Sequence, residues 1–217
     1  MDWYSAHIRH RRNASFMICV IMPVLLGIAL FFGAGCTRNK VIDEPVSEQK
    51  WTCGKEADEA MKRHDYQKAI RLHQEILQTE PDNALALYHL GYAHGQLGDH
   101  EREVFYYERA AGLGFKNNHF FFNMGMAYGE LNRIEESIKA FQKALDLHPD
   151  SAENHFGLAL ACQRGAADRR AEEEFLKAIE LDPSHTEARM YLSMLYADRG
   201  EMQKAASQLK KILEIDP

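Results

Sequence analysis

None of the short motifs that mark common classes of enzyme occurs in this sequence. The 217 residues contain no G-x-S-x-G turn around a nucleophilic serine, no Walker phosphate loop, no dinucleotide-binding fingerprint and no H-E-x-x-H zinc motif. The helical region described below takes up most of the chain and leaves no room for a catalytic domain. We therefore expect a protein that is not an enzyme and that carries no cofactor.

Basic residues are also fewer than acidic residues in this sequence. The chain has 26 lysines and arginines against 32 aspartates and glutamates, a formal net charge of −6. Arg9, Arg11 and Arg12 belong to the N-terminal stretch, so the remainder is more acidic still. Nucleic acids and anionic lipid surfaces bind clusters of lysine and arginine. We expect neither as a partner of the region after residue 36.

Cysteines and histidines lack the spacing of a disulfide scaffold or a metal site. The four cysteines stand at positions 19, 36, 53 and 162, which is no framework spacing. We expect Cys53 and Cys162 to lie too far apart to bridge. Among the eleven histidines, His89 and His94 are five residues apart and would lie on different sides of a helix. The sequence therefore predicts no disulfide and no metal ligand.

Two amphipathic helices are predicted within residues 118–151. Apolar residues that recur at i, i+3, i+4 and i+7 share one face of a helix. The first helix has such a face at Phe121, Met124, Gly125 and Tyr128. The second has it at Ile134, Ile138, Phe141, Ala144 and Leu145. A turn at Asn132 joins the two helices, and Pro149 ends the second. Such a hairpin cannot bury its apolar faces alone.

The same hairpin recurs with a period of 34 residues. Prolines mark it at positions 81, 149, 183 and 217, and Phe115 stands where one proline is missing. At this interval the first helices carry the pairs Leu90-Gly91, Met124-Gly125, Leu158-Ala159 and Leu192-Ser193. Small residues recur on the second helices at Ala69, Ser137, Ala171 and Ala205. A fixed period of this length indicates a repeat architecture.

This set of residues resembles the tetratricopeptide (TPR) repeat, whose pattern is W-x2-L-G-x2-Y, then A-x3-F, then P. Segment 118–151 matches nearly throughout, with Phe121 for the tryptophan and Ser137 for the alanine. The resemblance covers residues 50–217 in one register. It divides them into the repeats 50–83, 84–117, 118–151, 152–185 and 186–217. The first helix of repeat 50–83 matches the pattern poorly. It implies an all-α fold, a right-handed superhelical solenoid of helix-turn-helix hairpins.

Residues 1–36 have the features of an export signal or membrane anchor. Three arginines precede an uncharged apolar run from Ala14 to Phe32, and small residues and Cys36 follow. This end resembles a bacterial lipobox, which implies that Cys36 becomes the lipid-modified first residue of a lipoprotein. The run is also nearly long enough to span a bilayer as an uncleaved apolar helix, and simple secretion is a third interpretation.

Both membrane-bound interpretations place the repeats in the periplasm or another extracytoplasmic space, because the arginines stay inside. The polar segment 37–49 contains a proline and shows no period, so we expect it to be a tether. Whether the anchor lies in an inner or an outer membrane stays open.

A second apolar stripe runs along the first helices, one residue beyond those that pack within each hairpin. In TPR proteins these helices line a concave surface. The resemblance therefore implies a groove that binds a hydrophobic peptide or helix of a protein partner. Its floor would consist of Tyr88, Tyr92, Phe122, Met126, Phe156, Leu160, Met190 and Met194. Alternatively, these side chains are ordinary core between successive first helices, or the tether covers them.

Apolar residues near the C-terminus form a second candidate contact surface. They are Leu209, Ile212 and Leu213, which lie at helical spacing. Terminal repeats normally present a polar outer face. We expect this end to dock another protein or a second copy of the chain.

The predicted function is that of a non-enzymatic scaffold or adaptor, anchored in a membrane, which holds a hydrophobic partner segment in the TPR groove. Small TPR lipoproteins of this layout resemble the pilotins of type IV pilus and secretin systems. This implies a role in assembling a pilus, secretion or envelope complex. One alternative is a structural subunit that assembles through its C-terminal helix while the groove is filled. A further alternative is a small-molecule sensor.

Overall fold

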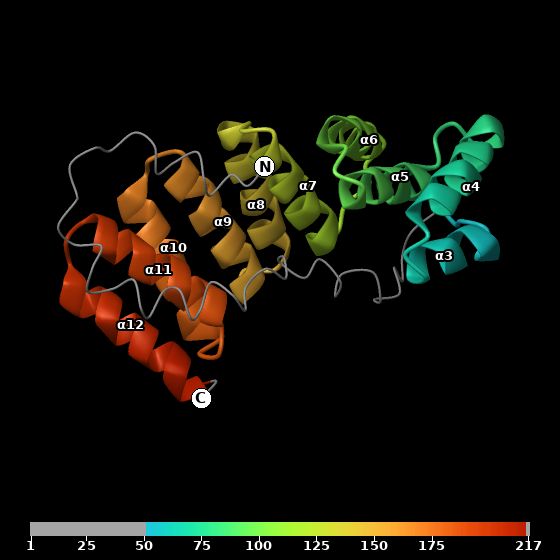
Figure 1. The fold of residues 1–217 in the computed structure, drawn as a ribbon. Helices are drawn as coiled ribbons and strands as arrows, with labels where there is room; N and C mark the ends of the chain where they lie inside the picture. The colour runs from blue at the N-terminus through green and yellow to red at the C-terminus, as the bar shows by residue number, and fades with distance from the viewer. Residues whose placement is uncertain (1–50, 216–217) are drawn as a thin grey trace. The chain divides into compact units, whose positions relative to one another are not determined.

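The computed structural model describes residues 51–215 of the chain, with the backbone alone at Asn118. The signal or anchor segment 1–36, including Cys36, and the tether 37–49 lie outside these residues. Within the described range the chain forms ten α-helices and no β-strand (Figure 1). The expectation of an all-α fold is confirmed for this range. No helix in it is both long and apolar enough to cross a membrane.

The helices come in pairs, and each pair lies within one 34-residue segment of the sequence. In chain order they are α3 (Lys55–Lys62) and α4 (Tyr66–Thr79), α5 (Ala84–Gln96) and α6 (His100–Gly112), α7 (Asn118–Glu130) and α8 (Ile134–Leu147), α9 (Ala152–Arg164) and α10 (Asp168–Leu181), α11 (Thr186–Asp198) and α12 (Met202–Ile215). The first helix of the degenerate repeat, α3, has only eight residues, against thirteen in the other first helices.

The turn within each pair contains one residue with a left-handed backbone. These residues recur every 34 positions: His64, Gly98, Asn132, Ala166 and Gly200, with φ between 56° and 80°. The residue after each of them donates its N–H to a carbonyl five residues back, as Arg133 does to Tyr128 at 2.9 Å. This pattern satisfies carbonyl groups at the end of the first helix. The predicted turn at Asn132 is confirmed.

Side chains at the helix starts satisfy free backbone N–H groups. Asp65, Asn83, Asp99, Asn117 and Ser151 each accept a hydrogen bond from the N–H three residues later. Four of the five acceptors are aspartate or asparagine, which are strong N-cap residues. The local sequence therefore determines where these helices begin.

Within a pair, small residues let the two helices approach closely. In the α7–α8 pair, Ser137 donates a hydrogen bond from Oγ to the carbonyl of Gly125 at 2.7 Å. The ring of Phe141 on α8 fills the space above Gly125, where a Cβ atom would lie 2.9 Å from the ring. The same ring packs against Gly157 on α9, where a Cβ would be 2.3 Å away. One aromatic side chain thus joins one hairpin to the next.

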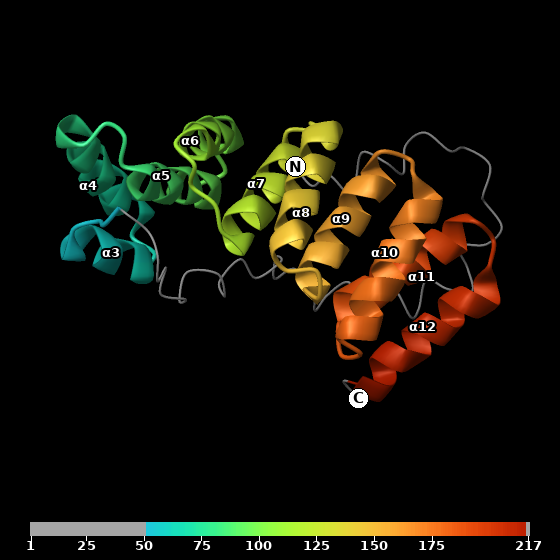
Figure 2. The ribbon, with the colours of Figure 1, turned by 180° about the vertical axis from the view of Figure 1, so that it is seen from behind.

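Successive hairpins pack against each other in chain order. Each second helix contacts the first helix of the next pair, as α8 does with α9 and α10 with α11 (Figures 1 and 2). The first helices α7 and α9 also contact each other. This arrangement brings the apolar stripes of neighbouring first helices side by side.

Candidate protein-binding surface

A stripe of partly exposed apolar side chains runs along three first helices. Its members occupy equivalent places on α7, α9 and α11, and the side chain of each is neither fully buried nor fully exposed. They are Phe122, Met126, Leu160, Met190 and Met194. We call these five residues the inner stripe. Phe122, Met126 and Leu160 also pack against the buried core of the last three hairpins, so part of each side chain is already fixed in place.

The structure buries the other three residues that the sequence assigned to a groove floor. Tyr88 is 6 % exposed, Tyr92 2 % and Phe156 5 %. The expectation that all eight side chains line an open surface is wrong for these three. These three side chains are instead part of the core between neighbouring helices, which was the alternative interpretation of the sequence.

Tyr88 belongs to an aromatic cluster where the second and third repeats meet. Its ring stacks on Phe115 with centroids 5.1 Å apart and on Tyr107 at 5.8 Å. Asn123 on α7 donates a hydrogen bond to the Tyr88 hydroxyl at 3.1 Å. Phe115 stands where the repeat pattern has proline, and this large ring closes over Tyr88. The side chain of Asn123 therefore points into the same cluster.

Phe156 is buried for a similar reason. It contacts Phe175 at 6.0 Å within its own hairpin and Tyr191 on the next first helix at 5.7 Å. The ring of His185, which caps α11, lies 4.8 Å away. Aromatic residues on both neighbouring elements therefore leave Phe156 no free face.

The segment before α3 covers part of the aromatic cluster. Trp51 packs on Phe115, with ring centroids 6.3 Å apart. Asn83 donates a hydrogen bond from Nδ2 to the carbonyl of Thr52 at 3.0 Å. Trp51 and Thr52 belong to the first repeat, and the tether 37–49, which was the cover expected from the sequence, lies outside the described residues. Within the described residues, the inner stripe therefore begins at α7 and does not extend to α5.

An ion pair crosses one edge of the inner stripe. Arg164 on α9 lies over Gly129 of α7, where a Cβ would come within 2.7 Å of Nη1. Its guanidinium is 3.8 Å from the carboxylate of Glu130. This edge of the stripe is therefore charged, as the rims of protein interfaces commonly are.

The candidate docking end at α12 is partly open. Leu213 is 57 % exposed and Ile215 39 % exposed, which makes Leu213 the most exposed large apolar side chain of residues 51–215. Leu209 and Ile212 are partly buried. The predicted residues thus share one helix, but Leu213 contributes most of the free apolar surface. Ile215 was not predicted.

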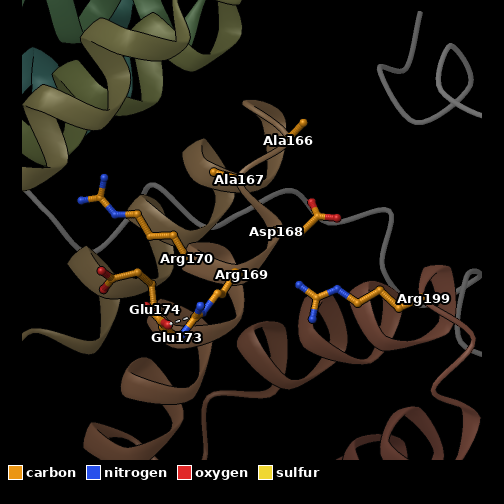
Figure 3. A pocket seen from close by; sticks show the side chains of 8 residues that line it. All are labelled: Ala166, Ala167, Asp168, Arg169, Arg170, Glu173, Glu174 and Arg199. Carbon is orange, nitrogen blue, oxygen red and sulfur yellow. Dashed lines mark ion pairs between the residues drawn. The ribbon is translucent and has the colours of Figure 1, made fainter.

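Two surface depressions lie away from the inner stripe. One is lined by residues of the α9–α10 turn, of α10 and by Arg199, which directly follows α11 (Figure 3). Arg169 pairs with Glu173 at 3.4 Å in this depression, as the dashed line in Figure 3 marks. The second depression lies at the turn after α8. Both are open to solvent, and two arginines of the first already have carboxylate partners, Arg169 in Glu173 and Arg199 in Glu172. Neither gives support to a small-molecule sensor.

The fold also gathers four polar side chains that the sequence did not connect. Cys53 before α3, Asp58 on α3, His73 on α4 and His89 on α5 come together, and their potential ligand atoms all lie within 4.8 Å of one another. Along the sequence His89 lies close only to His94, on the same helix. The four positions have no regular spacing, so no local signal could have identified the group.

Comparisons with known proteins agree with this architecture. Two family models for the tetratricopeptide repeat match the chain, one over residues 120–151 and one over residues 55–114 and 169–217. No curated protein sequence matches significantly.

Several solved structures share the fold. A crystal structure of MamA is 22% identical, with 74% of this chain and 94% of that chain covered and a TM-score of 0.69. MamA from residue 41 to its end, from Desulfovibrio magneticus RS-1, is 20% identical, with 76% and 97% covered and a TM-score of 0.70. YrrB, described as a TPR protein with an unusual peptide-binding site, is 21% identical, with 74% and 83% covered and a TM-score of 0.67. At these identities the likeness shows the fold alone.

Proposed function

Because this chain belongs to the tetratricopeptide repeat family, we propose that it is a non-enzymatic adaptor that binds a hydrophobic segment of a protein partner on its inner stripe. Proteins of this family serve as protein-interaction scaffolds. The observation that carries the proposal is the row of partly exposed apolar side chains on α7, α9 and α11. A row of this kind on neighbouring helices is a usual feature of protein-binding sites.

The composition of the inner stripe favours a partner segment with an apolar face. Three of its five residues are methionines, whose flexible and polarizable side chains adapt to partners of different shape. An amphipathic helix or an extended peptide offers an apolar face of matching width. The peptide-binding site named for YrrB is in keeping with this mode.

We place the repeats outside the cytoplasmic membrane, held by a lipid on Cys36 or by an uncleaved anchor helix. Arg9, Arg11 and Arg12 before an uncharged apolar run favour this location. An adaptor at this place would help to assemble a pilus, secretion or other envelope complex.

A second candidate function rests on α12. Its exposed Leu213 and Ile215 would allow a structural subunit to assemble end to end with a partner or with a second copy. In that case the inner stripe would take no part in binding.

Crosslinking of the full-length protein in its source cell separates the two functions. Captured proteins are identified by mass spectrometry for wild type and for three variants that circular dichroism shows to be folded. The stripe variant is Met126→Glu with Met194→Glu. The end variant is Leu213→Glu with Ile215→Glu. The control, Leu147→Glu with Leu176→Glu, changes side chains that are 42 % and 43 % exposed on second helices.

The proposal predicts a partner that wild type, end variant and control capture and that the stripe variant loses. Loss of the partner in the end variant alone would support end-on assembly instead. If all four proteins capture the same set, the inner stripe is not the binding site.

A further inference from the structure

Four side chains converge from four places in the first two repeats. Cys53 precedes α3, Asp58 lies on α3, His73 on α4 and His89 on α5. One sulfur, one carboxylate oxygen and two imidazole nitrogens all lie within 4.8 Å of one another. His73 is fully buried and the other three are partly buried.

The orientation of His73 is fixed by the backbone. Its Nδ1 lies 2.8 Å from the carbonyl oxygen of Ala69, which can only accept, so Nδ1 carries the proton. The lone pair of Nε2 is therefore turned towards the cluster, where Nδ1 of His89 lies 2.9 Å away. Histidines that bind metals usually donate their second N–H to a backbone carbonyl or a carboxylate in this way.

Burial disfavours the charged forms of Cys53, His73 and His89. It raises the pKa of the Cys53 thiol to about 12, an effect to which Asp58 and Glu80 add. It lowers the pKa of His89 to about 3, with His73 adding to the effect, and it lowers the pKa of His73 as well. Binding of a divalent cation would release the proton of the Cys53 thiol to solvent. The cation would then balance one thiolate and one carboxylate, so the occupied site would carry no net charge.

We propose that Cys53, Asp58, His73 and His89 form a binding site for a divalent transition-metal ion, of which Zn²⁺ fits best. Zn²⁺ prefers four ligands of this type, in a tetrahedron, at about 2.0–2.3 Å. Ligand atoms in such a tetrahedron are separated by roughly 3.3–3.6 Å. The two nitrogens would move apart by a few tenths of an ångström, and the widest pair would close by about 1 Å.

The ion would have a structural role. Four protein ligands leave no open position for substrate or water. It would join the segment before α3, both helices of the degenerate repeat and α5 of the next one. The first helix of the degenerate repeat has only eight residues, so the ion would add links where this helix offers a short packing surface. The site is separate from the inner stripe, so this inference does not depend on the proposed function.

Metal binding is measured on the full-length protein in detergent. After saturation with Zn²⁺ and exchange into metal-free buffer, elemental analysis should find one equivalent of zinc per chain. Titration with Co²⁺ should produce the strong visible bands of a tetrahedral site and the near-ultraviolet band of a thiolate bound to cobalt. Cys53→Ala and His89→Gln should each weaken binding by more than the 10- to 100-fold that loss of an outer-shell partner costs.

The matched controls are Cys162→Ala and His94→Gln, which change the same residue types elsewhere in the repeats. Both should keep one equivalent of metal. Binding that is equally strong in Cys53→Ala and in wild type would overturn the proposal, and so would the absence of binding by wild type.

A measurement on the wild-type protein alone tests the site even if the variants fail to fold. Bound Zn²⁺ should slow alkylation of Cys53 at least tenfold, as mapped by mass spectrometry, and leave that of Cys162 unchanged. An alkylation rate of Cys53 that saturating Zn²⁺ does not alter would contradict a site at this cluster.

Discussion

The carboxylate of Glu103 on α6 occupies the space where residue 95 on α5 would carry a Cβ atom. A Cβ at Gly95 would lie 2.2 Å from the carboxyl carbon of Glu103. Glu103 is 1 % exposed, and its Oε2 lies 2.8 Å from Nδ1 of His100. It stands where other second helices have a small residue such as Ala171 or Ala205. Glycine at residue 95 therefore leaves the space that the large, charged side chain of Glu103 occupies, at a position where other repeats have a small residue.

Gly95→Ala should destabilise the protein. The added methyl group collides with the buried carboxylate, and overpacking of this kind costs about 1–3 kcal/mol. The double variant Gly95→Ala with Glu103→Ala should regain most of the loss, because the last repeat already has Ala197 and Ala205 at these places. Urea denaturation of wild type, both single variants and the double variant measures the coupling. Additive effects would show that the two residues do not compete for the same space.

Ala166→Gly should stabilise the protein. Ala166 has φ of 56° in the α9–α10 turn, a left-handed conformation that costs an L-residue about 1–2 kcal/mol. The added freedom of glycine in the unfolded chain opposes this gain by about 0.4–1 kcal/mol. The reverse change, Gly98→Ala, is the matched control, because no other atom lies within 4 Å of the new Cβ. The thermal midpoint should rise for the first variant and fall for the second. A fall in both would exclude backbone strain at residue 166.

Asn83→Asp should release the segment before α3 without removing the helix cap. Asn83 accepts a hydrogen bond from the N–H of Ala86 and donates one to the carbonyl of Thr52, both at 3.0 Å. Aspartate keeps the acceptor and loses the donor. In a Trp3→Phe background, the emission of Trp51 should shift to longer wavelength as its ring leaves Phe115. Ser151→Asp, which adds a negative charge at the cap of α9, should leave the emission unchanged. An unshifted spectrum in Asn83→Asp would show that this hydrogen bond does not hold the segment.

His94 should make the protein less stable in acid. Burial lowers the pKa of His94, although Asp99 at 3.6 Å partly offsets the effect. Within residues 51–215 its Nε2 has no hydrogen-bond partner. As the pH falls below about 6.5, His94 becomes protonated in the unfolded chain but stays neutral in the folded protein. The free energy of unfolding then falls by up to about 1.4 kcal/mol per pH unit from this one residue.

The comparison of wild type with His94→Gln isolates this contribution. Urea denaturation between pH 7.5 and 5.0, with a chelator present, should give a steeper decline for wild type. His148→Gln, at an exposed position, controls for the loss of a histidine as such. Equal slopes in wild type and His94→Gln would mean that His94 does not oppose protonation in the folded state.

Much of the architecture follows from local patterns in the sequence. The 34-residue period, the apolar faces of the helices and turn residues such as Asn132 identify the five hairpins. These features act over a few residues, through helix periodicity, N-caps and backbone conformation, so they can be read without knowing the fold. The family resemblance correctly indicated that these hairpins form a repeat protein.

The degree of burial along the stripe could not be obtained in this way. Periodicity places Tyr88 and Met126 on equivalent faces of their helices, but Tyr88 is buried and Met126 is partly exposed. The difference arises because Phe115 packs on Tyr88 and Trp51 packs on Phe115, and both residues come from non-helical segments that differ from the repeat pattern.

By itself the sequence determined which residues form helices, where these begin and turn, and which face of each is apolar, because these properties depend on near neighbours along the chain. Only the tertiary structure decided which apolar residues stay accessible, that Glu103 fits against Gly95, and that Cys53 meets His73 and His89. These outcomes depend on how closely helices from different repeats approach, and that distance is set by the packing of side chains far apart in the sequence.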